Sequence, residues 1–193
     1  MNSAKILPVI FVLFFIACTQ PQSKQPGNIT DTMFDDYIKS LDTIPLPFKH
    51  SCSDAQFAEM SVHFDSAGFK KYKEADCIQP LGILFNDDTN IVTVDLSNAD
   101  FCKAPFLVSF DKKGNKLDSL NLYQNAFADT DATSRPYFRV GKDKSIVIID
   151  TTKKWKVGQF DKVVPGSETT TIDSTMYFLS EKGKFIKGIR KKL

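Results

Sequence analysis

The sequence has little of several residue types on which enzymes and nucleic-acid-binding proteins depend. Its 193 residues contain only two histidines and one tryptophan, and no Gly-x-Ser-x-Gly motif occurs. With so few candidate bases, serine hydrolase chemistry has no support. The formal net charge is only +2. A nearly neutral chain gives no electrostatic footprint for nucleic acid, so we set that class of partner aside.

Long apolar stretches are also missing, because the longest apolar run, residues 6–16, is interrupted at Pro8. A helix that crosses a bilayer needs about 20 apolar residues, so this run is too short to span one. The composition is that of a globular protein, with 42% hydrophobic and 25% charged residues. The length suits one domain, and the 17 phenylalanines predict that its core is rich in Phe.

The N-terminus has the order of features found in an export signal. A weakly basic start precedes the apolar run, which ends at Ala17 and Cys18, and the polar segment "TQPQSKQPGN" follows at once. This pattern resembles the signal of bacterial lipoproteins, in which a small residue precedes a cysteine that receives a diacylglycerol on its sulfur. Phe15 stands where that family usually has Leu. The resemblance implies a signal peptide of residues 1–17 and a lipid on Cys18. The alternative is a plain secretory signal with Cys18 as an ordinary residue.

The anchor that this resemblance implies would be stable. Each buried methylene contributes about 0.8 kcal/mol, so two or three acyl chains hold a protein on a membrane where one chain does not. Residues 18–28, which contain Pro, Gln, Ser and Gly, would form a flexible tether, and residues 29–193 would form a single domain. Thr19 is not the Asp that favours inner-membrane retention in this class, and no acidic cluster follows Cys18. We therefore expect an outer-membrane anchor with the domain facing the periplasm.

Export would place three cysteines in an oxidising compartment. Any two of Cys52, Cys77 and Cys102 can form a disulfide, which gives three one-bridge connectivities and one remaining thiol. A catalytic cysteine needs a nearby histidine, and the candidates are Cys52 with His50 or His63. A disulfide or a buried thiol is the simpler interpretation, and the spacing matches a zinc site only weakly. We expect no catalytic residue, no metal and no cofactor.

Two short helices are predicted after the tether. Apolar residues recur at helical spacing over residues 32–41, and Thr30 or Asp31 can cap that segment. The prolines of "TIPLPF" end it, because the residue before a proline favours extended backbone. A second helix is predicted over residues 53–60, whereas residues 64–76 are ambiguous.

From residue 78 onward the chain consists of short segments rich in β-branched and aromatic residues, separated by turn residues. These segments predict strands at "PLGILF", "IVTVDL", "PFLVSF", "KLDSLNLY", "PYFRV", "SIVIID", "KWKVGQF", "TMYFLS" and "KFIKGI". The turns in "SFDKKGNKL" and "LSEKGKFI" are typical of hairpins closed by a glycine bulge. "FNDDTNIV" and "VGKDKSIV" are two further turns between strands.

Four hairpins in sequence predict an antiparallel meander rather than a parallel sheet. The expected fold is mainly β with one or two short N-terminal helices, arranged as a curved sheet, a half-barrel or a small sandwich. An α+β arrangement is the broader alternative. "SIVIID" should lie centrally because it is almost continuously apolar. The basic C-terminal segment "KFIKGIRKKL" should form a sheet edge protected by charge.

The segment "FLVSFDKKGNKLDSLNLY" and the later "SIVIID" resemble a group of small bacterial envelope lipoproteins. In that group an extended segment ends in a lysine-rich glycine turn, and a strand containing Asp-Ser-Leu follows. The resemblance covers about the last two-thirds of the chain. It implies a place in the envelope and no particular activity.

Two acidic pairs, Asp87 with Asp88 and Asp129 with Asp131, offer the oxygen ligands that Ca²⁺ prefers. The full EF-hand spacing is missing, so we interpret both pairs as solvated loops. The basic tail, residues 182–192, can meet anionic lipid headgroups, but we favour a solubilising edge strand.

Several Asp-Ser or Asp-Thr steps resemble the acceptor pattern of periplasmic O-glycosylation in some bacteria. This resemblance implies Thr32 and Thr43, near the first helix, as the best candidate sites. Caps and turns are the simpler explanation, because Asp with Ser or Thr is common in both.

These observations predict a lipid-anchored, non-enzymatic envelope protein whose sheet surface meets another protein or a glycan. A more specific alternative is a periplasmic inhibitor or immunity protein that projects one loop into the cleft of a toxin or wall hydrolase. The long polar segment "FADTDATSRP" is the candidate for that loop. An enzyme that uses Cys52 with a histidine is the competing class. The expected partners are the membrane, through the N-terminal lipid, and an envelope protein or glycan.

Overall fold

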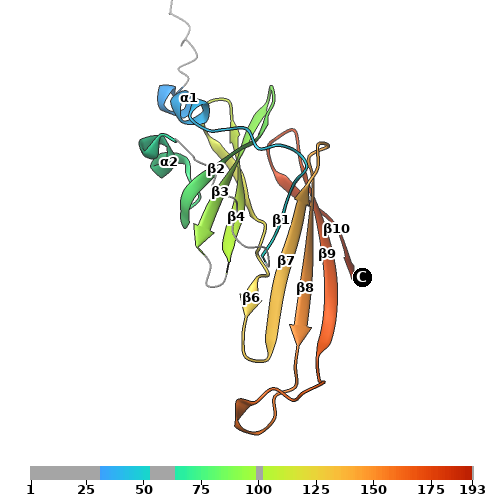
Figure 1. Cartoon of the computed structure of the whole chain (residues 1–193). Helices are drawn as coiled ribbons and strands as arrows, with labels where there is room; N and C mark the ends of the chain where they lie inside the picture. The colour runs from blue at the N-terminus through green and yellow to red at the C-terminus, as the bar shows by residue number, and fades with distance from the viewer. Residues whose placement is uncertain (1–30, 53–63, 99–101, 193) are drawn as a thin grey trace, which may run out of the picture.

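The computed structural model of the chain describes residues 31–52, 64–98 and 102–192, the last four of them without their side chains. Within these residues the fold is mainly β, with two short helices and two antiparallel sheets (Figure 1). The sheets pack face to face around a shared core, and the helices cover the far side of one sheet. The predicted fold class is therefore confirmed.

Sheet A is a four-stranded meander with the strand order β2-β3-β4-β5, and sheet B has the order β1-β7-β8-β9-β10, with β6 paired to β7. The strands of sheet A are β2 Cys77–Asn86, β3 Asn90–Asn98, β4 Lys103–Asp111 and β5 Lys116–Asn121. The strands of sheet B are β1 Phe48–Ser51, β6 Phe127–Ala128, β7 Ala132–Val140, β8 Ser145–Lys154, β9 Thr169–Leu179 and β10 Phe185–Lys192. The helices are α1 Thr32–Lys39, α2 Ser66–Tyr72 and the short 3-10 turn η1 Gln159–Asp161.

Helix α1 begins where the sequence predicts. The Asp31 carboxylate caps it by accepting a hydrogen bond from the backbone N–H of Met33 at 3.2 Å. The buried face of α1, which includes Phe34 and Tyr37, packs on the outer face of sheet A.

Helix α2 lies in the segment whose sequence is ambiguous, and it packs beside α1. A Cβ atom added at Gly68 would come within 2.6 Å of the Cβ of Tyr37, so only glycine allows this close approach. The helix predicted over residues 53–60 lies outside the described residues.

All four predicted turns join neighbouring antiparallel strands. In the β4–β5 turn, the Asp111 carboxylate accepts a hydrogen bond from the N–H of Lys113 at 2.8 Å, and Gly114 takes the left-handed conformation with φ +83°. The β9–β10 turn closes in the same way, with the N–H of Gly183 donating to the carbonyl of Ser180 at 2.9 Å. "SIVIID" lies in β8 between β7 and β9, and β10 lies at the sheet edge, as predicted.

Two predictions of local structure are wrong. The segment "KWKVGQF" predicts a strand, but β8 ends at Lys154, and residues 155–168 form a loop that projects beyond both sheets (Figure 1). Within the described part of the chain, the β-pairing there is a single bridge between Val157 and Val163. "FADTDATSRP" predicts a long loop, but β6 pairs with β7, and only residues 129–131 turn between them. None of the helices in the described ranges is long and apolar enough to cross a membrane.

Candidate functional site

The cysteines join the two sheets. Cys52, which follows β1, forms a disulfide with Cys102, which precedes β4, and the two Cα atoms are 5.6 Å apart. The structure thus selects one of the three connectivities that the sequence leaves open. Cys77 is a buried free thiol, and its burial, together with the charge of Asp95, raises its pKa to about 12. A thiol held neutral in this way is a poor nucleophile.

The Cys52–His50 pair considered from the sequence is not formed. Cys52 has no free thiol in the structure, and the Nδ1 atom of His50 lies 2.9 Å from the hydroxyl of Tyr123. His63 and Cys18 lie outside the described residues. Thr32 and Thr43 are both exposed, and their glycosylation stays a prediction.

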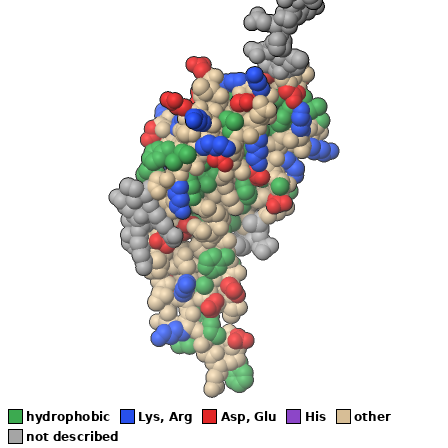
Figure 2. Space-filling model, turned by 180° about the vertical axis from the view of Figure 1, so that it is seen from behind, with side chains coloured by type: hydrophobic (Ala, Val, Ile, Leu, Met, Phe, Trp, Pro, Cys, Tyr) green, Lys and Arg blue, Asp and Glu red, His purple; other side chains and the backbone are tan. Residues whose placement is uncertain are grey.

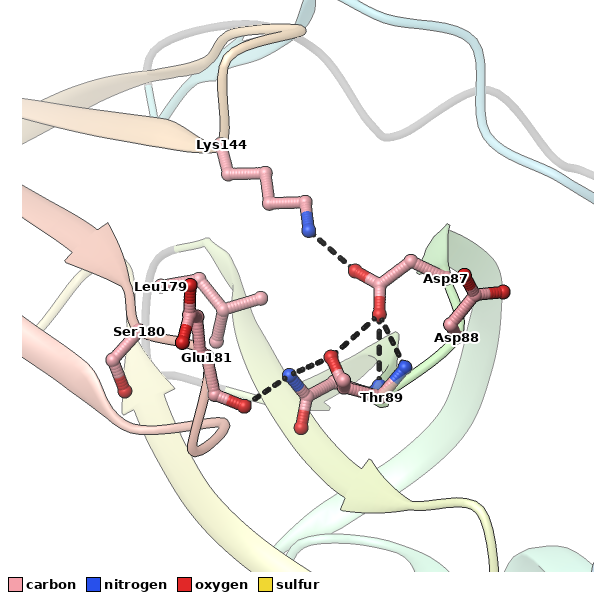
Figure 3. A pocket seen from close by; sticks show the side chains of 8 residues that line it. Asp87, Asp88, Thr89, Lys144, Leu179, Ser180 and Glu181 are labelled. Atoms are coloured by element: carbon pink, nitrogen blue, oxygen red, sulfur yellow. Dashed lines mark hydrogen bonds and ion pairs between the residues drawn. The ribbon is translucent and has the colours of Figure 1, made fainter.

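An open pocket of about 350 Å³ lies where three hairpin turns meet, and it includes the Asp87–Asp88 pair (Figure 3). Both oxygens of the Asp87 carboxylate already accept hydrogen bonds, one from Thr89 and Asn90 and the other from Lys144. Burial raises the pKa of Asp87, but the hydrogen bond from Lys144 and those from the turn outweigh it and hold the pKa well below its usual range.

The turns that line this pocket are joined to one another by side-chain contacts. The side-chain amide of Asn90 donates to the carbonyl of Glu181 at 3.0 Å, so the β2–β3 turn is fastened to the β9–β10 turn. Among the described residues, no group of three His, Cys, Asp or Glu side chains could hold a metal ion. Asp129 and Asp131 lie in the exposed β6–β7 turn.

The most distinctive surface is the outer face of sheet B. Side chains that alternate along a strand point to opposite faces, and directly paired residues share a face. The register therefore places Val147 opposite Met176, and Ser145 opposite Phe178, which in turn pairs with Ile186. The inner positions between them, such as Ile146 and Ile148, are buried in the core.

No helix covers this outer face among the described residues. Its apolar side chains keep much of their surface in contact with solvent: Ile172 is 37% exposed, Met176 36%, Phe178 45% and Ile186 51%. The same face carries cations on the β1 and β7 side, since Lys49 pairs with Arg139. Arg135 lies four residues from Arg139 along β7, on the same face, and is also exposed. The strand positions on this face that the structure describes carry no carboxylate.

The second distinctive feature is the loop of residues 155–168, which we call the finger. It begins where the N–H of Trp155 donates to the carbonyl of Asp131 at 2.8 Å, and it is held by a hydrogen bond from the N–H of Gly158 to the carbonyl of Lys162 at 2.8 Å. Phe160 lies at its end and is 88% exposed. Figure 2 shows hydrophobic side chains at this narrow end of the molecule, next to basic and acidic ones.

The backbone at the end of the finger is strained. Phe160 has φ 61° and ψ 34°, and Asp161 has φ 55°. Both values fall in the left-handed region, which glycine, asparagine and aspartate tolerate, so the strain lies at the bulky Phe160. A large apolar side chain on a strained backbone, with most of its surface in solvent, contributes little to the stability of the fold. Its ring is therefore available for contact with a partner.

The charge of the chain is divided unevenly between its C-terminal third and the remaining residues. Residues 132–192, which build most of sheet B and the finger, contain fourteen Lys and Arg but only six Asp and Glu, a net charge of +8. The other residues therefore carry −6 of the chain's total of +2. Sequence reasoning missed this division because it used the total alone, and it missed the finger although Gly158 and the Pro165-Gly166 pair are turn signals.

Comparison with known proteins adds no relative: no family model, no curated protein and no solved structure matches the chain. The finger and the outer face of sheet B are therefore identified as the candidate functional site from their exposed apolar side chains and their charges alone.

Proposed function

We propose that the chain is a lipid-anchored, non-enzymatic protein of the bacterial envelope that binds a protein partner through the finger. The observation that carries this proposal is Phe160, a strained and 88% exposed aromatic at the end of a projecting loop. Buried aromatic anchors supply much of the binding energy in protein interfaces, and a convex loop fits a concave pocket on a partner.

The residues beside Phe160 favour a protein over a lipid bilayer as the partner of the finger. Asp161 adjoins Phe160 and is exposed, and a carboxylate is not readily carried into hydrocarbon. In a protein interface the same carboxylate and the neighbouring Lys162 can pair with charges at the rim of a pocket. Aliphatic residues such as Val157 and Val163, both about 40% exposed, suit a protein surface better than a sugar.

The lipid expected on Cys18 gives the mechanism. An anchored domain is confined to one surface, which raises its effective concentration towards partners on the same membrane. Helix α1, which follows the tether, and the finger lie at opposite ends of the molecule (Figure 1). The anchor therefore leaves the finger free to meet a partner.

A periplasmic inhibitor is a second candidate, and the shape of the finger favours it. An inhibitor of this kind needs a loop that enters a partner's cleft. The segment "FADTDATSRP" cannot be that loop, because most of it is paired in β6 and β7. The finger has the required projection, with Phe160 at its end.

Site-specific photo-crosslinking in the source bacterium tests the binding proposal. A photoreactive phenylalanine analogue at position 160 should form one discrete protein adduct, and the same analogue at Lys182, on an exposed turn of sheet B, should not. The partner peptide identified by mass spectrometry should map to a pocket on that protein. Identical adduct patterns from positions 160 and 182 would remove the finger from the proposal.

The anchor is tested separately by metabolic labelling with palmitate. The wild-type chain should incorporate the label, and the Cys18→Ala variant should not. Label in both, or in neither, would contradict the lipid-anchored part of the proposal.

A further inference from the structure

The two sheets differ in what covers them, and this difference raises the question of what meets sheet B. Helices α1 and α2 cover the outer face of sheet A, where Ile91, Val108 and Phe110 are buried beneath them. The outer face of sheet B has apolar residues at Ile172 and Phe178 with no such cover among the described residues. Exposed apolar side chains grouped on one face of a sheet in this way indicate an interaction surface.

The charged side chains on this face indicate what kind of partner the face binds. Lys49 and Arg139 face the same side as the apolar residues of β9, and neither they nor Arg135 makes an ion pair with a described residue. Arg139 does lower the pKa of Asp143 in the adjoining β7–β8 turn, after the hydrogen bonds from Ser145. Lys153 on this face pairs with Glu168. The face still combines apolar surface with the positive charge of Lys49, Arg135 and Arg139, which suits an anionic occupant.

A second copy of the chain is a poor occupant. An isologous dimer would place the same face of two copies together, so a basic face would meet a basic face. The half of the chain that builds sheet B carries a net charge of +8, which opposes such a contact. The basic edge strand β10 disfavours edge-to-edge pairing for the same reason.

We infer that the outer face of sheet B docks on the surface of an anionic lipid bilayer, so that the domain lies on the membrane that carries its anchor. This inference rests on the proposed lipid anchor at Cys18. A basic and apolar surface is attracted both by anionic headgroups and by the interfacial region of the bilayer. Lipid attachment and a basic surface are the two signals that together hold a protein firmly on a membrane.

The geometry of the chain permits this arrangement. Asp31 lies thirteen positions after Cys18, and an extended chain spans at most about 3.3–3.6 Å per residue, so the tether can reach about 45 Å. The negatively charged half of the molecule, with helices α1 and α2, then faces away from the bilayer. The finger extends from the end of β8 along the membrane, where it can meet a membrane-bound partner (Figure 1).

Tryptophan quenching by brominated lipids tests this inference on the full lipidated chain in vesicles. The chain has a single tryptophan, Trp155, so a Trp155→Phe background allows one reporter to be placed at will. Phe178→Trp reports on the outer face of sheet B, with Ile186→Trp as a second reporter should the first variant fold poorly. Ile78→Trp is the matched control, because Ile78 is exposed to a similar extent, 47%, but lies on β2 of sheet A.

In vesicles of brominated phosphatidylglycerol with phosphatidylethanolamine, the reporters at 178 and 186 should be quenched and the reporter at 78 should not. Quenching should be lost with brominated phosphatidylcholine alone. It should also be lost in the Arg135→Glu/Arg139→Glu variant and in about 1 M salt, where the Debye length falls to about 3 Å.

Flotation of the vesicles separates this inference from the anchor. A chain that floats with vesicles while the reporter at 178 stays unquenched would keep the anchor and overturn the docking of sheet B. Equal quenching at 78 and 178 would overturn it as well, because it would show no preferred face. An emission shift at 178 without bromine quenching would overturn it too, because it would assign the face to a second copy of the chain. A chain that does not float would overturn the anchor and, with it, this inference.

Discussion

Sheet A and sheet B are built by the same turn chemistry but differ in how they are covered. Each contains a four-stranded meander with a glycine-closed turn between its last two strands, at Gly114 and Gly183. Strand β3 of sheet A is buried at all but its last position, because the other sheet covers one face and helices cover the other. Strand β7 of sheet B alternates between buried and exposed residues. The strand pattern determines the fold, and the presence or absence of covering helices determines which sheet surface is exposed to partners.

The difference extends to charge. Residues 132–192, which include the finger, carry a net charge of +8, and the remaining residues, which include the helices, carry −6. The small total charge of +2 therefore conceals an uneven distribution of charge along the chain. Such a division says little about stability and more about orientation towards a charged surface.

Equivalent truncations on the two sheets should have very different effects on stability. Phe34 is 1% exposed between α1 and sheet A, so Phe34→Ala should reduce the free energy of unfolding by about 3–5 kcal/mol. Phe178 on the uncovered face should lose less than about 1 kcal/mol on the same change. Urea unfolding followed by circular dichroism measures both. Equal losses would mean that sheet B is covered as sheet A is.

The disulfide should contribute strongly, because it joins the two sheets. Cys52 and Cys102 are 50 residues apart, and closing a loop of that size stabilises by about 4 kcal/mol in the chain-entropy account. The Cys52→Ser/Cys102→Ser variant should show that loss in urea unfolding, and a reducing agent should bring the wild type to the same level. Cys77→Ala is the control, since reducing agent should still destabilise it. A wild type that is indifferent to reduction would contradict the bridge.

Strand β3 of sheet A carries a buried carboxyl group that should make stability fall at neutral pH. Asp95 is fully buried, one of its oxygens accepts from the N–H of Glu74 and the other has no hydrogen-bond partner within the described residues. Burial raises its pKa from 3.8 to about 7. The folded protein therefore binds a proton that the unfolded chain releases, and this stabilising contribution is lost as pH rises from about 4 through 7.

The shift of about 3 pH units corresponds to a loss of up to roughly 4 kcal/mol at alkaline pH. Asp95→Asn, which stays neutral, should be more stable than the wild type above pH 7, and the gain should disappear near pH 4. Thermal unfolding across this pH range measures the difference. A constant difference between the two proteins would show that Asp95 does not titrate in this way.

The smallest effect is expected at the end of the finger, and its sign is opposite. Phe160→Asn should relieve the left-handed strain and raise the free energy of unfolding by about 1 kcal/mol while removing the exposed ring. The variant should also lose the partner adduct, tested with a photoreactive residue at a neighbouring finger position. A destabilised variant would show that Phe160 packs against the rest of the chain.

Much of the fold follows from local sequence. Asp111, Gly114 and Gly183 fix their turns whatever lies around them, and the helical spacing from Phe34 to Ile38 fixes the face of α1. The separation into two sheets does not follow from local signals, because strand pairing depends on partners distant in the chain. The four-residue strand β1, for example, pairs with β7 across about 90 residues and has no strand pattern of its own.

The candidate site was harder to predict for a physical reason. "SIVIID" is almost continuously apolar, which indicates burial on both faces, yet Val147 and Ile149 point to the uncovered side. The same β-branched and aromatic residues that favour strands, in "KWKVGQF", form the finger, because no strand is available to pair with them. A sequence pattern indicates the backbone conformation that a segment favours. It does not indicate whether a neighbouring strand is present for that segment to pair with.

The central claim is that the finger and the outer face of sheet B make contacts outside the chain in the envelope. Hydroxyl-radical footprinting of the native envelope, compared with the purified full chain in detergent, tests it most directly. Met176, Phe178 and Phe160 should be oxidised in the purified protein and protected in the envelope, whereas Ile78 should react equally in both. Equal oxidation of all four residues in the two samples would contradict the account.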